Sequence, residues 1–231
     1  MTYVLHYAPD NASLIVRLVL EELGLPYETR LVDRRARAQE GAAYRALNPA
    51  GLIPALETPE GVIFETGAIV LWLADRAGRM APAPSDPARG DFLKRLFFTS
   101  NTLHAMLRMT FYPEKYVGED AGAQAALRAQ LVARGEAMSL PNALSLLDRE
   151  LSGSEGVDVL SCYLACLLRW CALYPAGDTG WFALSDYPAL QRMVASLEGR
   201  PAVLRAARAE GLGPHPFTLP QFAEPPEGSA T

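Results

Sequence analysis

Residues 48–76 read NPAGLIPALETPEGVIFETGAIVLWLADR and carry four local signals in a fixed order. The first is the turn Asn48-Pro49-Ala50-Gly51, in which proline restricts one backbone angle and glycine allows a left-handed one. The second is the apolar run 52–56, whose internal Pro54 is tolerated only at an edge, a strand start or a bend. The stretch therefore predicts a turn and then a strand whose open backbone can pair with an extended peptide.

The second half of the stretch predicts a hairpin followed by a helix. Residues 59–61 (Pro-Glu-Gly) separate the first apolar run from a second one at 62–64. Glu65 and Thr66 then place a carboxylate and a hydroxyl cap at the start of a helix. A helix start attracts anions, and a neighbouring carboxylate holds an ammonium group, so this pair suits the zwitterionic end of an amino acid. A lone Glu-Thr pair is more often a simple cap.

The order of the four signals resembles the glutathione-binding half of the thioredoxin-like domain in the glutathione transferase family. The shared pattern is NP-x-G-x-(I/V)-P-x-L, a hairpin, and E-(S/T)-x-A-I-x-x-(Y/W)-L, and the chain is most similar to bacterial, theta/beta-like members of the serine type. The resemblance implies a cis bond before Pro54 and pairing of the Ile53 backbone with the cysteinyl part of glutathione. It also implies that Glu65 and Thr66 hold the γ-glutamyl end.

Strand and helix patterns alternate before residue 77. Strand patterns at 2–7 and 27–32 flank a helical one that ends at Gly24, and a short helix carries Tyr44. Together with the stretch 48–76, the order is strand, helix, strand, helix, strand, strand, helix, which supports an α/β unit. By resemblance, residues 1–77 are an α/β thioredoxin-like domain that binds glutathione.

The composition changes after residue 77. Glycine and prolines predict a linker over residues 78–90, and apolar residues at helical spacing predict an all-α C-terminal domain over residues 91–213. By resemblance, the two domains together are expected to have the cytosolic glutathione transferase fold. The proline-rich end, residues 214–231, is expected to be a mobile tail.

Two helices of the second domain carry specific signals. Pro141 is expected to kink or break a helix that spans roughly residues 124–151. Asp158 and Ser161 are expected to cap a helix over residues 159–174, with the two residue types inverted relative to the family. The motif LLRW at residues 167–170 also resembles bacterial members.

Composition and charge exclude several classes of protein. Half of the 231 residues are hydrophobic, which predicts a globular chain, and the formal charge of −5 gives no reason to expect nucleic acid or an anionic membrane as a partner. No apolar run approaches the roughly 18 residues of a membrane span, and the N-terminus lacks the pattern of a signal peptide. We therefore expect a cytoplasmic protein.

Three cysteines, Cys162, Cys166 and Cys171, cluster in one predicted helix. They have no matching cysteines elsewhere, so the sequence indicates neither a disulfide framework nor a metal site. We expect them to be buried as small hydrophobic residues.

A glutathione-conjugating enzyme must stabilise a thiolate, because a free thiol with a pKa near 8.5 is only slightly ionised at neutral pH. Tyr7, Asn11 and Ser13 are the candidate donors around the first helix start, although Tyr7 also fits a strand and the other two fit helix caps. Alignment with the family places Ser13 at the catalytic hydroxyl of the serine-type classes and Ala12 at the cysteine of the beta class. We expect Ser13 to be catalytic, with Tyr7 or Asn11 as second choices.

Asn101, His104 and Arg108 form a polar row at helical spacing beside an apolar stripe. A solvated helix face is the default interpretation. By resemblance, this helix lines the cleft opposite the first domain, and His104 falls near a histidine of beta-class members. We therefore expect His104, Arg108 and Tyr112, with Phe111, to border the site of the electrophile.

Two functions are consistent with these residues. The first is a homodimeric glutathione transferase that uses glutathione as co-substrate, needs no metal, and conjugates it to a small hydrophobic electrophile in detoxification. The second is a non-catalytic glutathione-transferase-like binding or interaction protein, because a fold does not determine a function. Ser13, Glu65 and Thr66 favour the enzyme.

Overall fold

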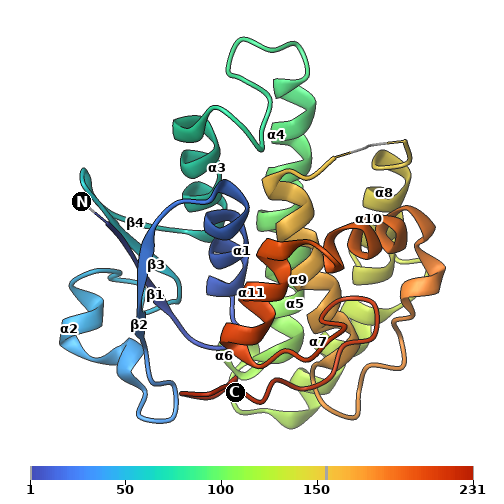
Figure 1. The fold of residues 1–231 in the computed structure, drawn as a ribbon. Coiled ribbons are helices and arrows are strands. Elements are labelled where there is room, and N and C mark those ends of the chain that lie inside the picture. Colours follow the sequence, from blue (N-terminus) through green and yellow to red (C-terminus); the bar gives the residue numbers. More distant parts are fainter. Residues whose placement is uncertain (1, 154–155, 231) are drawn as a thin grey trace.

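The computed structural model describes residues 2–153 and 156–230 (Figure 1). Its first part is a four-stranded sheet in the order β2-β1-β3-β4, in which β1 pairs with β2 in parallel and with β3 antiparallel, and β3 pairs with β4 antiparallel. The elements in chain order are β1 (Tyr3–Tyr7), α1 (Ser13–Leu23), β2 (Tyr27–Leu31), the 3₁₀ turn η1 (Ala38–Glu40), α2 (Ala42–Arg45), β3 (Ala55–Thr58), β4 (Gly61–Phe64) and α3 (Thr66–Ala77). The predicted order of strands and helices is confirmed.

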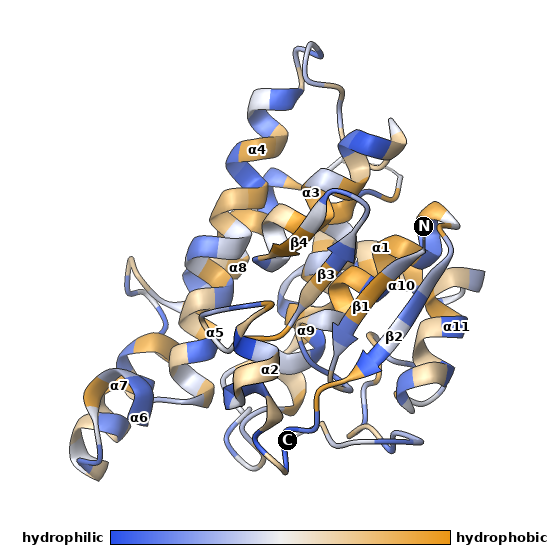
Figure 2. Ribbon diagram, turned by 90° about the vertical axis from the view of Figure 1, so that its left-hand side faces the viewer, coloured by the Kyte–Doolittle hydropathy of each residue, from blue (hydrophilic) through white to orange (hydrophobic). Residues whose placement is uncertain are grey.

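The two faces of the sheet have different coverings because successive strand residues point to opposite sides. Leu5 and Tyr7 of β1 join the main hydrophobic core with α1 and α3. His6 points to the other face, where its ring lies 6.0 Å from that of Tyr44 in α2. Figure 2 shows the apolar residues of β1 beside those of α1, which identifies this face as the core side.

Three separate segments of the chain meet at one end of the sheet, which we call the sheet edge, where β1 and β4 end and β3 begins. The register places His6, Ala55 and Phe64 side by side across β1, β3 and β4. Since β1 and β4 run toward this edge and β3 starts from it, the loop 8–12, the segment 52–54 and the start of α3 all meet here. The strand directions alone therefore assemble one site from distant residues.

All elements described after α3 are helical. They are α4 (Arg89–Phe98), the π-helical turn η2 (Thr99–Leu103), α5 (His104–Phe111), α6 (Glu114–Val117), α7 (Ala121–Val132), α8 (Leu140–Glu150), α9 (Val159–Leu173), the 3₁₀ turn η3 (Leu184–Asp186), α10 (Pro188–Glu198) and α11 (Pro201–Glu210). Every residue of α9 except Ala172 is buried, including the three free cysteines. Helix α1 packs against α3, α9 and α11, so it joins the sheet to the helical part. No helix within the described ranges combines the length and apolarity that a membrane crossing requires.

The two helix signals of the second domain are visible in the structure. The single helix expected over residues 124–151 is divided, because α7 ends at Val132 and Pro141 lies in the first turn of α8, where a proline needs no N–H. The cap of α9 is confirmed as a reciprocal pair. The N–H of Ser161 donates to Asp158 Oδ1 at 2.7 Å, and the N–H of Asp158 donates to Ser161 Oγ at 2.9 Å.

The C-terminal segment differs from the expected mobile tail. Phe217 is only 2% exposed, and Glu198 Oε1 accepts the N–H groups of Phe217 and Thr218, both at 2.9 Å. Further along, Gly228 lies so close to Leu31 of β2 that a Cβ atom there would meet its side chain at 2.7 Å. Residues 214–230 therefore lie along the helical part and reach the sheet, because a buried aromatic ring and the half-buried carboxylate of Glu198 anchor them.

Candidate glutathione site

Helix α3 begins at the sheet edge with an uncapped first turn. Its N-cap residue Glu65 is exposed and has a φ of 72°, and no side chain caps the helix. Left-handed backbone costs free energy at a residue other than glycine, and such residues cluster at ligand sites. The buried Thr66 is the first helical residue. The free N–H groups and the Glu65 carboxylate together offer opposite charges to a zwitterion.

The backbone of Ile53 is open next to this helix start. The bond between Ile53 and Pro54 is cis, as the family resemblance implied. Leu52 O accepts hydrogen bonds from the side chains of Tyr44 and Asn48, whereas the ladder of β3 starts only at Ala55. Among the described residues, the N–H and C=O of Ile53 have no hydrogen-bond partner. An extended peptide can therefore pair with Ile53.

The hydroxyl groups of Ser13 and Tyr7 both donate hydrogen bonds to other groups of the protein. Ser13 is fully buried, and its Oγ donates to Ala8 O at 3.0 Å while accepting the N–H of Ala8 at 3.2 Å. Tyr7 is 3% exposed and donates to Glu227 of the C-terminal segment; burial, with Glu227, raises the pKa of Tyr7. In this structure the hydroxyl proton of Ser13 is directed to the Ala8 carbonyl, and the catalytic role expected for Ser13 stays a prediction.

Asn11 is the candidate with an available donor. It is partly exposed, and its Oδ1 accepts the N–H of Ala12 at 2.8 Å. An amide whose oxygen accepts from a backbone N–H directs its NH₂ group the other way. This NH₂ group donates to no other residue within the described parts of the chain. Asn11 therefore presents a donor beside the end of β1 and the start of α1.

His104 is the first residue of α5, and its side chain contacts α9. Its Nδ1 lies 2.9 Å from the hydroxyl of Tyr163, and its ring centroid lies 5.7 Å from those of Tyr163 and Trp170. Burial, reinforced by the positive charge of Arg108, lowers the pKa of His104 to about 4. His104 is therefore neutral at neutral pH.

The other two residues expected at the electrophile site lie further along the same helix. Arg108 is partly exposed in the last turn of α5, and Tyr112, directly after α5, accepts a hydrogen bond from Arg34 Nη2 at 2.8 Å. The row from His104 to Tyr112 therefore runs from the helix interface toward the end of β2.

An aromatic group at the ends of α5 and α9 borders the loop of Asn11. The ring of Tyr174 lies 6.1 Å from Phe111 and 5.6 Å from Phe222, and its hydroxyl donates to Asp10 at 3.1 Å. The sequence pointed to Phe111 but not to Tyr174 or Phe222. Tyr174 looked like the end of a helix, and Phe222 lay in the expected mobile tail.

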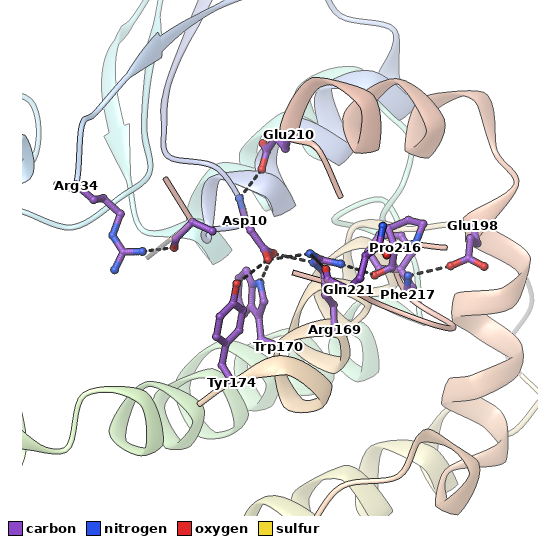
Figure 3. A network of polar contacts seen from close by, with 11 residues as sticks. Asp10, Arg34, Arg169, Trp170, Tyr174, Glu198, Glu210, Pro216, Phe217 and Gln221 are labelled. Carbon is purple, nitrogen blue, oxygen red and sulfur yellow. Dashed lines mark hydrogen bonds and ion pairs between the residues drawn. The ribbon is translucent and has the colours of Figure 1, made fainter. Parts of the chain in front are cut away.

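Sequence reasoning also missed the residues that hold this loop from α9. Asp10 lies in the turn before the first helix start, where it looked like one more polar cap, and Arg169 stood out only as part of LLRW. The signal was present, because an arginine inside an otherwise apolar helix is buried only when a carboxylate pairs with it. Figure 3 shows that Asp10 is this carboxylate.

Comparison with known proteins identifies the family. A family model described as the glutathione S-transferase N-terminal domain matches residues 12–76. The structure of a sphingomonad glutathione S-transferase complexed with glutathione has a TM-score of 0.71 and 31% identity, over 91% of this chain and 100% of that chain. The chain belongs to the glutathione S-transferase family.

Two further relatives agree with this assignment. Glutathione S-transferase GST-4.5 of Xanthomonas campestris is 29% identical over 218 residues, 90% of this chain and 98% of that protein. A glutathione transferase family member from Pseudomonas fluorescens, solved with two glutathione molecules bound, has a TM-score of 0.72 and 26% identity over 89% of this chain and 92% of that one. This glutathione transferase therefore has the predicted fold, a thioredoxin-like α/β part followed by a helical part. Within residues 2–153 and 156–230 there is no group of three or more His, Cys, Asp or Glu side chains suited to a metal ion.

The lowered pKa of His104 predicts a pH-dependent stability. Its pKa is near 6.5 in the unfolded chain and about 4 in the folded protein, so the unfolded state binds more protons between these values. We expect the free energy of unfolding to fall as the pH drops from about 6.5 to about 4. Denaturant titrations across this range measure the slope, and His104→Phe should remove the His104 component of it. A His104 midpoint near 6.5 in an NMR titration of the folded protein would contradict the prediction.

Proposed function

We propose that this enzyme binds glutathione along the sheet edge and conjugates its thiolate to a small hydrophobic electrophile. The observation that carries the proposal is the convergence of three binding segments on one edge. The ends of β1 and β4 are two strand spacings apart, about 10 Å, because β3 lies between them. An extended tripeptide also spans about 10 Å, so glutathione reaches from one to the other.

The direction of glutathione follows from the chemistry of the two ends. The first turn of α3 and the carboxylate of Glu65 suit the γ-glutamyl group, which carries both charges, and Thr66 adds a hydroxyl. The cysteinyl backbone then pairs with Ile53, held next to Pro54. This orientation directs the thiol toward the end of β1.

Asn11 is the donor that we propose for the thiolate. Its NH₂ group is available, whereas the hydroxyls of Ser13 and Tyr7 donate to Ala8 and Glu227. A hydrogen bond to a charged acceptor is about twice as strong as one between neutral groups, so it stabilises the thiolate more than the thiol. The nearby start of α1 adds a favourable dipole.

The electrophile would bind against the aromatic group beside this donor. Tyr174 and Phe111 offer an apolar wall close to Asp10 and hence to Asn11, and Tyr112 with Arg108 continues it along α5. The ring of neutral His104 packs near that of Trp170, which in turn donates to Asp10. Retention on immobilised glutathione, followed by turnover with a generic aryl halide, tests the function as a whole; retention without turnover would favour the non-catalytic alternative.

We also propose a homodimer that uses β4 and α4. Val62, Phe64 and Phe97 are 38%, 39% and 53% exposed, and exposed apolar side chains that gather in a patch mark interaction sites. The helix that follows β4 contacts the turn that follows α4, since a Cβ atom on Gly67 of α3 would lie 3.4 Å from Ser100 of η2. The domain limits given above and the cytoplasmic location stay predictions.

The proposed role of Asn11 predicts a specific change in the bound thiol. Asn11→Ala removes a hydrogen bond to a charged group, worth about 1.5–3 kcal/mol, so the thiol pKa should rise by about one to two units. Turnover at neutral pH should fall at least tenfold and recover at higher pH, as the thiol then ionises unaided. Ultraviolet absorbance of the bound thiolate measures the pKa directly. Ser13→Ala is the matched control and should lower stability without moving the thiol pKa; the opposite pattern would return the role to Ser13.

The γ-glutamyl site predicts a loss of affinity. Glu65→Ala and Thr66→Ala each remove a contact of about 1.5–3 kcal/mol to a charged group, which corresponds to roughly ten- to a hundredfold weaker binding of glutathione. Calorimetric titration measures the dissociation constant. Glu60→Ala, at an exposed carboxylate of the preceding hairpin that pairs with Arg76, is the control and should leave affinity unchanged. Unchanged affinity in both site variants would show that the γ-glutamyl end binds elsewhere.

The dimer proposal predicts a change in mass. The wild-type chain should be a dimer by light scattering at micromolar concentration, and Phe97→Glu should produce monomers because a carboxylate is costly to bury in an apolar interface. Leu219→Glu, at an apolar residue that is 74% exposed in the C-terminal segment, is the control and should stay dimeric. A monomeric wild type would refute the proposal.

A further inference from the structure

The carboxylate of Asp10 is held by four donors from one side (Figure 3). Arg169 binds it in a bidentate manner, with Nε to Oδ1 at 2.8 Å and Nη2 to Oδ2 at 2.9 Å. Trp170 Nε1 donates to Oδ1 at 2.8 Å, and the Tyr174 hydroxyl donates to Oδ2 at 3.1 Å. Both members of the ion pair have fully buried side chains. The side chain of Asp10 is therefore fixed in position by α9 and by Tyr174, which directly follows α9.

The backbone of Asp10 is held from a second side. Its N–H donates to Glu210 Oε2 at 2.8 Å, and the other oxygen of Glu210 accepts from Arg17 Nε at 2.7 Å. Glu210 is fully buried at the end of α11. Asp10 also has a φ of 47°, in the left-handed region that disfavours residues with a side chain. Two helices of the helical part thus hold the chain in a turn that it does not adopt readily by itself.

Arg169 makes four hydrogen bonds to the described residues. Besides the two to Asp10, it donates from Nη1 to Pro216 O at 3.1 Å and from Nη2 to Gln221 O at 2.8 Å. A rigid guanidinium held by four hydrogen bonds cannot move without breaking several of them. A buried ion pair is nevertheless no more stabilising than well-packed apolar residues of the same volume, so stability alone does not account for this arrangement.

The next residue in the chain is Asn11, whose amide is the donor that we propose for the thiolate. We propose that Asp10 and Arg169 are positioning residues, which hold the left-handed turn so that the Asn11 amide stands within hydrogen-bond distance of the glutathione thiolate. This inference rests on the proposed function of Asn11. Adjacent Cα atoms are only about 3.8 Å apart, so a rotation at Asp10 moves the Asn11 amide almost directly. A displacement of about 1 Å is enough to lose a catalytic contact.

The first experiment weakens the hydrogen bonds from Arg169, Trp170 and Tyr174 to Asp10, which we call the clamp, without leaving a charge unpaired. Trp170→Phe keeps the ion pair and removes one donor to Asp10, and the double variant Asp10→Asn with Arg169→Met removes both charges together. We expect the thiol pKa of bound glutathione to rise by roughly half a unit in the first and by about one unit in the second, which is about a three- to tenfold smaller thiolate fraction at neutral pH. Affinity for S-methylglutathione, which has no ionisable thiol, should stay within about twofold of wild type.

The thiolate absorbance, rather than the rate alone, is followed as a function of pH. Burial raises the pKa of Glu210 to about 7, so a rate profile would also contain its titration. Asp148→Asn is the matched control, since Asp148 Oδ1 accepts the N–H groups of Ala189 and Leu190 at the start of α10 and does not contact the loop. It should lower the melting temperature but leave the thiol pKa unchanged. Equal shifts in the control and the clamp variants would reduce the clamp to a structural role and overturn the inference.

A double-mutant cycle with Asn11→Ala separates this inference from the proposed function. If the clamp acts through Asn11, then Trp170→Phe should raise the thiol pKa in the wild type but not in the Asn11→Ala background. Additive shifts in the two backgrounds would overturn the inference while leaving Asn11 as the donor. An Asn11→Ala variant with an unshifted thiol pKa would instead refute the proposed donor. Folded-state circular dichroism of each variant confirms that the comparison is between native proteins.

Discussion

A guanidinium inside an apolar helix must find a counter-charge, and the structure around α9 follows from this constraint. Arg169 lies in the most buried helix of the protein, and its partner Asp10 comes from the loop between β1 and α1. The same guanidinium donates to two carbonyl groups of the C-terminal segment. A single side chain therefore links the sheet, the helical part and the last residues of the chain, and it does so beside the candidate site for the thiol.

The second constraint is the direction of the strands. Because β3 starts at the edge where β1, β2 and β4 end, the open backbone of Ile53 lies between the loop of Asn11 and the start of α3. The site that we propose consists of an open strand start, a helix start and the amide of Asn11. Most of the groups that it offers to glutathione are therefore backbone groups.

The side chains of Ser13 and Asn11 differ in the local hydrogen bonds that they make. A serine close to a turn can satisfy nearby backbone groups, and Ser13 does so with both groups of Ala8. Asn11 satisfies one N–H with its oxygen and still has a donor to offer. Alignment compares positions along the chain, whereas the availability of a proton depends on which acceptors the fold brings near.

The sequence by itself determined the elements and the family. The turn at Gly51, the start of α3 at Thr66 and the cap of Asp158 depend on residues within a few positions of one another, so local chemistry was sufficient to predict them. The cis bond before Pro54 was implied by the family resemblance. Only the tertiary structure decided the partner of Arg169, the acceptor of the Ser13 hydroxyl and the path of residues 214–230. These features depend on contacts between residues that are distant in the chain, such as Asp10 with Arg169, and no local pattern specifies which of the many distant acceptors is brought within reach.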